Sequence, residues 1–265
     1  MDFLTTIVNA SLDAGKEILR IYHTNDFNIE YKSDESPLTQ ADKNAHKVIL
    51  TYLKKTGIPV LSEEGRNIPF SERKNREKLW IADPLDGTKE FIKRNGEFTV
   101  NIALIENGTP VMGVVYAPVP DIMFIGEKGT GAFRVENASG VDVISALTEE
   151  TKLPAKQYSD KDYYGIVASR SHLSDETKAF IEEIKSEHKN VKIVTKGSSL
   201  KICMVAEGAA DIYPRFAPTS EWDTAAGHAV VLAAGGRIVQ ATDDNKELRY
   251  NKENLLNPWF IVKRK

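Results

Sequence analysis

Two aspartates stand three residues apart in the segment WIADPLDGTKEF, which covers residues 80–91. The apolar run before Asp83 is typical of a buried strand, so Asp83 and Asp86 are expected beside the core, where an uncompensated charge is costly. Two more acids, Glu63 and Glu64, follow a shorter apolar run. Because open α/β folds bind ligands at strand ends, the pattern predicts an acidic site that a cation neutralises. For any one of these acids taken alone, a solvated turn is the alternative.

The residue types around these acids favour a hard divalent cation over zinc. Carboxylate and carbonyl oxygens suit Mg²⁺, and the sequence holds no cluster of histidines and cysteines. Magnesium at such a site can neutralise a phosphate, stabilise a leaving oxygen and turn a bound water into a nucleophile. Thr88 is placed to hydrogen-bond that water, because it directly follows Gly87, a residue that tolerates unusual backbone angles. The acids therefore indicate metal-dependent phosphate chemistry.

A second segment, KGSSLK at residues 196–201, has the composition of an anion site. It offers a glycine, two hydroxyl groups and the start of a helix, where backbone amides point at a bound anion. Ser198 and Lys201 are about one helical turn apart and can share a face. A solvated lysine on an amphipathic helix is the alternative interpretation of Lys201.

Apolar periodicity predicts the elements that must position these residues. Helical spacing covers residues 2–22, and a second helix begins at about Thr39 and ends before Gly57. Short strands are expected directly before both acidic pairs, with a solvated, charged loop at residues 65–78 between them. Turn residues at regular spacing from Glu97 onward predict an antiparallel meander.

Strands and helices alternate in the rest of the chain, a pattern typical of an α/β unit. We therefore predict one chain with an α+β fold in two halves. The N-terminal half, residues 1–140, carries most of the expected metal ligands, and the C-terminal half, residues 141–265, carries the expected substrate contacts.

Composition excludes several other classes of protein. The 265 residues carry a net charge of -3, which gives no reason to expect nucleic acid as a partner. The single cysteine, Cys203, lies in an apolar helical run and is expected to be a small buried hydrophobic residue. The N-terminus lacks the pattern of a signal peptide, and no apolar stretch is long enough to cross a bilayer. A cytoplasmic location is the expectation.

Several motifs together resemble a known family. WIADPLDGTKEF, with SEE upstream and WDTAAGHAVVLAAGG downstream, resembles the inositol monophosphatase superfamily of Mg²⁺-dependent, lithium-sensitive phosphatases. GTKEF, GVVYAPV, GSSLK and YPR are similar to its CysQ-type branch, the 3'(2'),5'-bisphosphate nucleotidases. The match runs from PLTQAD to LLNPWF, nearly the whole chain. It implies a layered α/β/α/β/α sandwich of the inositol monophosphatase/fructose-1,6-bisphosphatase type, with the site between the two halves.

The resemblance also implies roles for individual residues. Two or three Mg²⁺ ions would be held by Glu63, Asp83, Asp86, Asp223 and the carbonyl of Leu85. The attacking water would be oriented or activated by Asp42, Glu64 and Thr88. The substrate would be contacted by Gly87, Thr88, His172, Gly197, Ser198, Lys201, Arg215 and Asp223.

Three of these residues have simpler interpretations. Asp223 could merely cap the helix that follows it, and Asp42 lies in the first turn of a helix, where an acid is favoured anyway. His172 could be a residue at a helix start that contacts no ligand.

The activity implied by the resemblance is hydrolysis of adenosine 3',5'-bisphosphate to AMP and phosphate, with conversion of PAPS to APS as a further candidate. The small nucleotide bisphosphate would be a by-product of sulfate assimilation. The alternatives are an inositol monophosphatase or fructose-1,6-bisphosphatase activity, or a nucleotide-binding regulator without turnover. The regulator is disfavoured because it would not need Asp42, Glu64 and Thr88. Relatives suggest a monomer or a homodimer.

Overall fold

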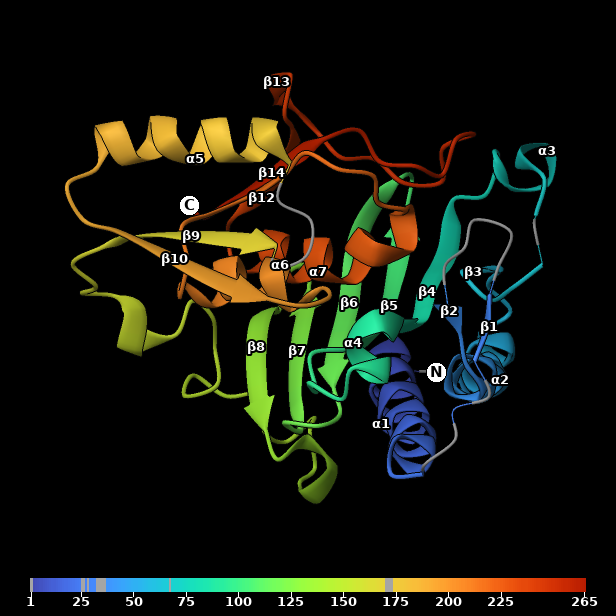
Figure 1. Ribbon diagram of the computed structural model, residues 1–265. Helices are drawn as coiled ribbons and strands as arrows, with labels where there is room; N and C mark the ends of the chain where they lie inside the picture. Colours follow the sequence, from blue (N-terminus) through green and yellow to red (C-terminus); the bar gives the residue numbers. More distant parts are fainter. Residues whose placement is uncertain (1, 25–26, 28, 32–36, 67, 170–173) are drawn as a thin grey trace.

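A computed structural model of the protein describes residues 2–24, 27, 29–31, 37–66, 68–169 and 174–265 (Figure 1). Two six-stranded sheets form its frame. The first sheet has the strand order β3 (Val60–Ser62), β4 (Lys78–Asp86), β5 (Thr99–Glu106), β6 (Thr109–Ala117), β7 (Ile122–Glu127) and β8 (Gly131–Glu136). The second sheet has the order β10 (Val191–Lys196), β9 (Tyr164–Ser169), β11 (Ile212–Arg215), β14 (Phe260–Lys263), β12 (Arg237–Gln240) and β13 (Asp243–Glu247).

Helices flank these sheets, and short elements connect them. The helices are α1 (Phe3–Tyr22), α2 (Gln40–Leu53), α3 (Phe70–Arg73), α4 (Thr88–Ile92), α5 (Asp175–Glu187), α6 (Leu200–Glu207) and α7 (Glu221–Ala233). A two-stranded ribbon joins β1 (Glu30–Tyr31) to β2 (Pro37–Leu38), and 3₁₀ turns cover Lys54–Thr56, Ala138–Gly140 and Lys156–Tyr158. Among the described residues, no helix is long and apolar enough to cross a membrane.

Strand pairing matches the patterns predicted from the sequence. In the first sheet β3 and β4 run parallel, so the acids that follow Ser62 and Ala82 emerge at the same edge. The strands from β4 to β8 form the expected antiparallel meander. In the second sheet β9, β10 and β11 are parallel, and the remaining pairs are antiparallel.

Three apolar cores lie between five layers, the middle core on both sides of α6 and α7, and this order confirms the predicted α/β/α/β/α sandwich. The side chains of β4 alternate between two of these cores: Trp80 packs toward α1 and α2, and Ile81 packs toward α6 and α7. The middle core also contains residues of the second sheet, including Tyr213 and Phe260. The third core lies between the second sheet and Ile181 on α5. The middle core joins the two halves of the chain, and their division near residue 140 stays a prediction.

Close backbone contact fixes the position of α7 on the first sheet. A Cβ atom added to Gly113 would lie 2.6 Å from the carbonyl oxygen of Ala226, and one added to Gly126 would lie 2.4 Å from the Cα atom of Val230. Any larger residue at either glycine would push α7 away. The contact therefore sets the position of the N-terminus of α7, where Asp223 lies.

The charged loop at residues 65–78 corrects one expectation. It is not simply a solvated segment, because it contains α3, and Arg73 at the end of α3 is only 3% exposed. The guanidinium of Arg73 donates to the side-chain oxygen of Asn251 (2.9 Å) and to the carbonyl of Lys252 (2.6 Å). These acceptors lie far along the chain, so no local pattern could reveal that the arginine is buried.

Cys203 is fully buried, as predicted, and burial raises the pKa of its thiol well above the usual value.

Candidate active site

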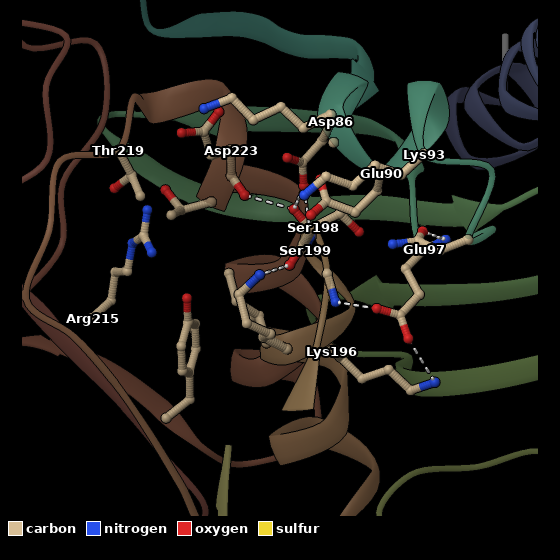
Figure 2. Close-up of a pocket in the computed structure, with 18 of the residues that line it drawn as sticks. Asp86, Glu90, Lys93, Glu97, Lys196, Ser198, Ser199, Arg215, Thr219 and Asp223 are labelled. Carbon is tan, nitrogen blue, oxygen red and sulfur yellow. Dashed lines mark hydrogen bonds and ion pairs between the residues drawn. The ribbon is translucent and has the colours of Figure 1, made fainter. Parts of the chain in front are cut away.

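Three aspartates from the two halves of the chain meet at one edge of the first sheet. Asp83 and Asp86 come from the end of β4, and Asp223 comes from the first turn of α7. One carboxylate oxygen of each lies within 4.8 Å of the others. Figure 2 shows Asp86 and Asp223 at the head of a cavity.

An irregularity in β4 brings the first two aspartates together. Residues three apart in a regular strand point to opposite faces of the sheet. Here Asp83 pairs with Asn101 while Asp86 pairs with Thr99, so β4 advances three residues where β5 advances two. The extra residue is a bulge, and it turns both carboxylates toward the same side.

Each aspartate accepts a backbone hydrogen bond on one carboxylate oxygen. Oδ1 of Asp83 accepts from the amide of Leu85 (3.0 Å), and Oδ2 of Asp223 accepts from the amide of Ser220 (2.7 Å). Oδ2 of Asp86 accepts from the amide of Ser199 (2.5 Å). Asp223 therefore has the helix-capping role considered in the sequence and also lies in the acidic cluster.

Electrostatics show that these acids are compatible with a cation. Burial, with the charges of Glu63 and Asp86 added, raises the pKa of Asp83 well above its usual range. Burial and the charge of Asp86 raise the pKa of Asp223 to about 8. A divalent cation would relieve this repulsion, and carboxylate oxygens are the ligands that Mg²⁺ prefers. The donor set therefore fits the predicted metal, and Glu63 lies close enough to hydrogen-bond Asp83.

The residues predicted to handle water form a second group beside the cluster. The hydroxyl of Thr88 donates to Oδ1 of Asp42 (3.1 Å) and lies 3.4 Å from the carbonyl oxygen of Leu85. Oδ2 of Asp42 accepts from the amide of Thr39 (2.7 Å), as in a helix capping box. Burial raises the pKa of Asp42, and the nearby charge of Glu64 adds to the shift. The structure thus brings Asp42, Glu64 and Thr88 together.

The cavity below the cluster has a volume of about 360 Å³. Its charged and hydroxyl-bearing lining residues are Asp86, Lys89, Glu90, Lys93, Glu97, Lys196, Ser198, Ser199, Lys201, Tyr213, Arg215, Thr219, Asp223 and Thr224. Lys89, Glu90 and Lys93, which follow the DPLDG segment closely, also lie in this lining. Lysine and arginine side chains therefore line the cavity on either side of Asp86, where an anionic ligand could contact them (Figure 2).

Lys201, in the first turn of α6, and Arg215, at the end of β11, are two cations of the cavity lining. The ammonium of Lys201 donates to the carbonyl of Ser198 (2.6 Å), and burial lowers the pKa of Lys201 to about 8. One terminal nitrogen of Arg215 donates to the carbonyl of Pro218 (3.2 Å). Both cations line the cavity, as the substrate prediction requires, although each is also bonded to the backbone.

The amides at the start of α6 have protein partners. The amide of Gly197 donates to Glu97 (2.9 Å), and the amide of Ser199 donates to Asp86. The sequence predicted that this segment binds an anion of the substrate, and in this structure two carboxylates of the protein take that place. Gly87 has a φ of +96°, as expected for its turn, and a Cβ there would lie 3.3 Å from that of Ser198.

Ser199, Glu97 and Tyr213 are among the residues of this site that the sequence did not predict. Ser199 lies inside the KGSSLK segment but was not singled out, and neither Glu97 nor Tyr213 carried a local signal. All three became visible only when the fold brought β5, α6 and β11 around one cavity. His172, which was predicted to contact substrate, lies outside the described residues.

Comparison with known proteins agrees with this geometry. The chain is 44% identical over 265 residues to the 3'(2'),5'-bisphosphate nucleotidase CysQ of Salmonella typhimurium, with 98% of each chain covered. It is 43% identical to the protein of the same name from Escherichia coli K12, again with 98% of each covered.

Solved structures give the same result. CysQ of Bacteroides thetaiotaomicron, described as a bacterial member of the inositol monophosphatase family, superposes with a TM-score of 0.90 at 50% identity and covers 99% of this chain and 97% of its own. The extragenic suppressor protein SuhB of Bartonella henselae superposes with a TM-score of 0.75 at 26% identity, covering 100% and 95%. The model of the inositol monophosphatase family matches residues 2–260, which include the first sheet, the second sheet up to the start of β14, and every acid of the site. The chain belongs to the inositol monophosphatase family, as its motifs predicted.

Proposed function

We propose that this chain is a Mg²⁺-dependent phosphatase that hydrolyses the 3'-phosphate of adenosine 3',5'-bisphosphate to give AMP and phosphate. The observation that carries the proposal is the cluster of Asp83, Asp86 and Asp223 at the head of a cavity that also contains Lys201 and Arg215. One end of the cavity suits a metal and a scissile phosphate, and the other suits a second anion. Relatives named as 3'(2'),5'-bisphosphate nucleotidases over nearly the full length support this substrate class.

The residues that would hold Mg²⁺ are Glu63, Asp83, Asp86, Asp223 and the carbonyl of Leu85. When bound, Mg²⁺ would stabilise negative charge on the phosphate and leaving oxygens and lower the pKa of a coordinated water. The sequence-based expectation of two or three ions stays a prediction.

The attacking water would be positioned by Thr88. Because its hydroxyl proton is directed at Asp42, the oxygen of Thr88 is free to accept a hydrogen bond from that water. Asp42, which is bonded to Thr88, and Glu64, whose charge acts on Asp42, would accept the proton that the water gives up. The water would attack the 3'-phosphorus in line, on the side opposite the ribose oxygen.

The phosphate that is not hydrolysed would be held by Lys201 and Arg215. A cavity of about 360 Å³ lies within the range typical of small-molecule sites. Gly87, Gly197 and Ser198 also line the cavity, and the substrate contacts expected of them stay predictions. A substrate contact by His172, a cytoplasmic location and a monomeric or homodimeric state stay predictions.

The experiment that tests the function is phosphate release from four substrates, with excess Mg²⁺ and with EDTA. The panel is adenosine 3',5'-bisphosphate, PAPS, inositol 1-phosphate and fructose 1,6-bisphosphate. We expect Mg²⁺-dependent release with the highest kcat/KM for the adenosine bisphosphate. A preference for either sugar phosphate would establish one of the alternative phosphatase activities, and binding of the nucleotide without release would favour the regulator.

A further inference from the structure

We propose that Ser199 is a positioning residue for the metal site: its amide and hydroxyl hold the carboxylate of Asp86 in one orientation beside the first turn of α7. The inference rests on the proposed function, because it concerns the residues that would hold Mg²⁺. It goes beyond that function by assigning a role to a side chain that is not itself among the proposed ligands.

The contacts of Ser199 converge on one oxygen of Asp86. Its amide lies 2.5 Å and its hydroxyl 2.7 Å from Oδ2 of Asp86. The side chains of Thr99 and Asn101 reach the same oxygen at 3.5 Å. All the hydrogen bonds described for Asp86 thus end on Oδ2, which holds the carboxylate in one orientation and leaves Oδ1 for a cation. Ser199 is 2% exposed, so water cannot easily replace it.

The same hydroxyl lies where the two halves of the chain meet. Oγ of Ser199 lies 2.7 Å from the carbonyl oxygen of Asp223 and accepts a hydrogen bond from Asn101 (2.9 Å). Figure 2 shows Ser199 beside Asp86, with a dashed line that reaches Asp223. Asp86 belongs to the first sheet and Asp223 to α7, so Ser199 lies at the junction of these two elements. Its hydroxyl oxygen is within hydrogen-bond distance of both residues.

Geometry also limits what the hydroxyl can do. With Asn101 donating to it, Oγ has one proton to give and two acceptors at equal distance. A carboxylate is a stronger acceptor than a peptide carbonyl, so the proton is expected to point at an ionised Asp86. The hydroxyl then stabilises the negative charge of Asp86, which a cation needs, and keeps the carboxylate directed at the cluster.

A purely structural serine would affect folding but not metal affinity. Side chains that orient a metal ligand typically account for about 10–100-fold in metal affinity. The proposal therefore predicts that Ser199→Ala weakens Mg²⁺ binding by about tenfold or more, within the range of a charge-assisted hydrogen bond.

The test is calorimetric titration of Mg²⁺ into the full-length, EDTA-treated protein without substrate. The matched control is Ser11→Ala, the same change at a fully buried serine of α1 whose hydroxyl has no hydrogen-bond partner among the described residues. We expect the control to bind Mg²⁺ within about twofold of the parent, because nothing in it touches a ligand. Thermal unfolding of both variants would show whether Ser199→Ala is folded.

A second variant keeps the proposal testable if Ser199→Ala does not fold. Asn101→Ala removes the donor that holds the hydroxyl of Ser199, together with its own longer contact with Oδ2 of Asp86 (3.5 Å), but leaves the hydroxyl in place, so we expect a smaller loss of Mg²⁺ affinity, about threefold. Parent-like affinity in a folded Ser199→Ala, or in Asn101→Ala if that is the only folded variant, would overturn the inference and leave the function intact. A parent that binds no Mg²⁺ would instead overturn the metal dependence of the proposed function.

Discussion

Replacing Asp223 by asparagine is expected to have opposite effects on metal binding and on the stability of the metal-free protein. Asparagine has the same shape and can still accept from the amide of Ser220, so the cap of α7 is largely kept. It removes one charge from a cluster in which the charge of Asp86 already disfavours ionisation. Mg²⁺ affinity should fall because a ligand charge is lost, while the metal-free protein should gain stability at neutral pH.

The magnitude follows from the pKa of Asp223, which the fold raises from 3.8 to about 8. Between these values the folded state holds a proton on Asp223 that the unfolded state has released. Stability of the metal-free parent therefore falls as pH rises across this window and is level above it. One proton corresponds to a slope of at most about 1.4 kcal/mol per pH unit, which partial solvent exposure of the side chain reduces. The asparagine variant has no titrating group at this position, so its free energy of unfolding lacks this dependence on pH.

The assay is urea unfolding in EDTA at about pH 5.5, 6.5 and 7.5, in which the free energy of unfolding of Asp223→Asn is compared with that of the parent. The advantage of the variant should grow with pH, and excess Mg²⁺ should shrink or reverse it by stabilising the parent. The buried His228 is common to both proteins and cancels in the difference. The exposed Asp160→Asn variant controls for the loss of one charge. An advantage that does not change with pH would refute the reasoning.

Five further outcomes are expected. EDTA should abolish phosphate release and Mg²⁺ restore it, whereas full turnover in metal-free buffer would contradict the mechanism; inhibition by millimolar Li⁺ is expected from the family resemblance. Thr88→Ala should lower kcat by about two to four decades with Mg²⁺ binding unchanged, and parent-like turnover would remove Thr88 from the mechanism. Arg215→Ala should raise KM for adenosine 3',5'-bisphosphate by about one to two decades and hardly change hydrolysis of 3'-AMP. Equal losses on both substrates would mean that the 5'-phosphate is bound at another place. Calorimetry should show Mg²⁺ affinity rising with pH up to about 8, because Asp223 must lose its proton to bind, and a flat profile would contradict this.

Long periodic elements of the fold could be predicted from the sequence. The apolar spacing that predicted a helix over residues 2–22 corresponds to α1 at Phe3–Tyr22, and the meander and the later alternation also match. Short elements such as α3 and β13 were not predicted, because a few residues carry no periodicity and depend on tertiary contacts. Arg73 is an example: its partners lie in a loop far along the chain.

The candidate site could be predicted only in part, because contacts between distant parts of the chain complete it. Asp83 and Asp86 stand out as acids after an apolar run, but their spacing in a regular strand would send them to opposite faces. The bulge between them, which the sequence does not show, brings them together. Ser199 and Glu97 act through contacts with residues about 100 positions away, and such pairs have no signature in a single sequence.

The central claim is that this site removes the 3'-phosphate and keeps the 5'-phosphate. Phosphorus NMR of adenosine 3',5'-bisphosphate incubated with the protein and Mg²⁺ tests it directly, because the two phosphates have separate resonances. We predict that the 3'-phosphate signal is replaced by that of inorganic phosphate, that the 5'-phosphate signal of AMP remains, and that EDTA stops the change. Loss of the 5'-phosphate with 3'-AMP as the product, or no change with Mg²⁺ present, would contradict the account.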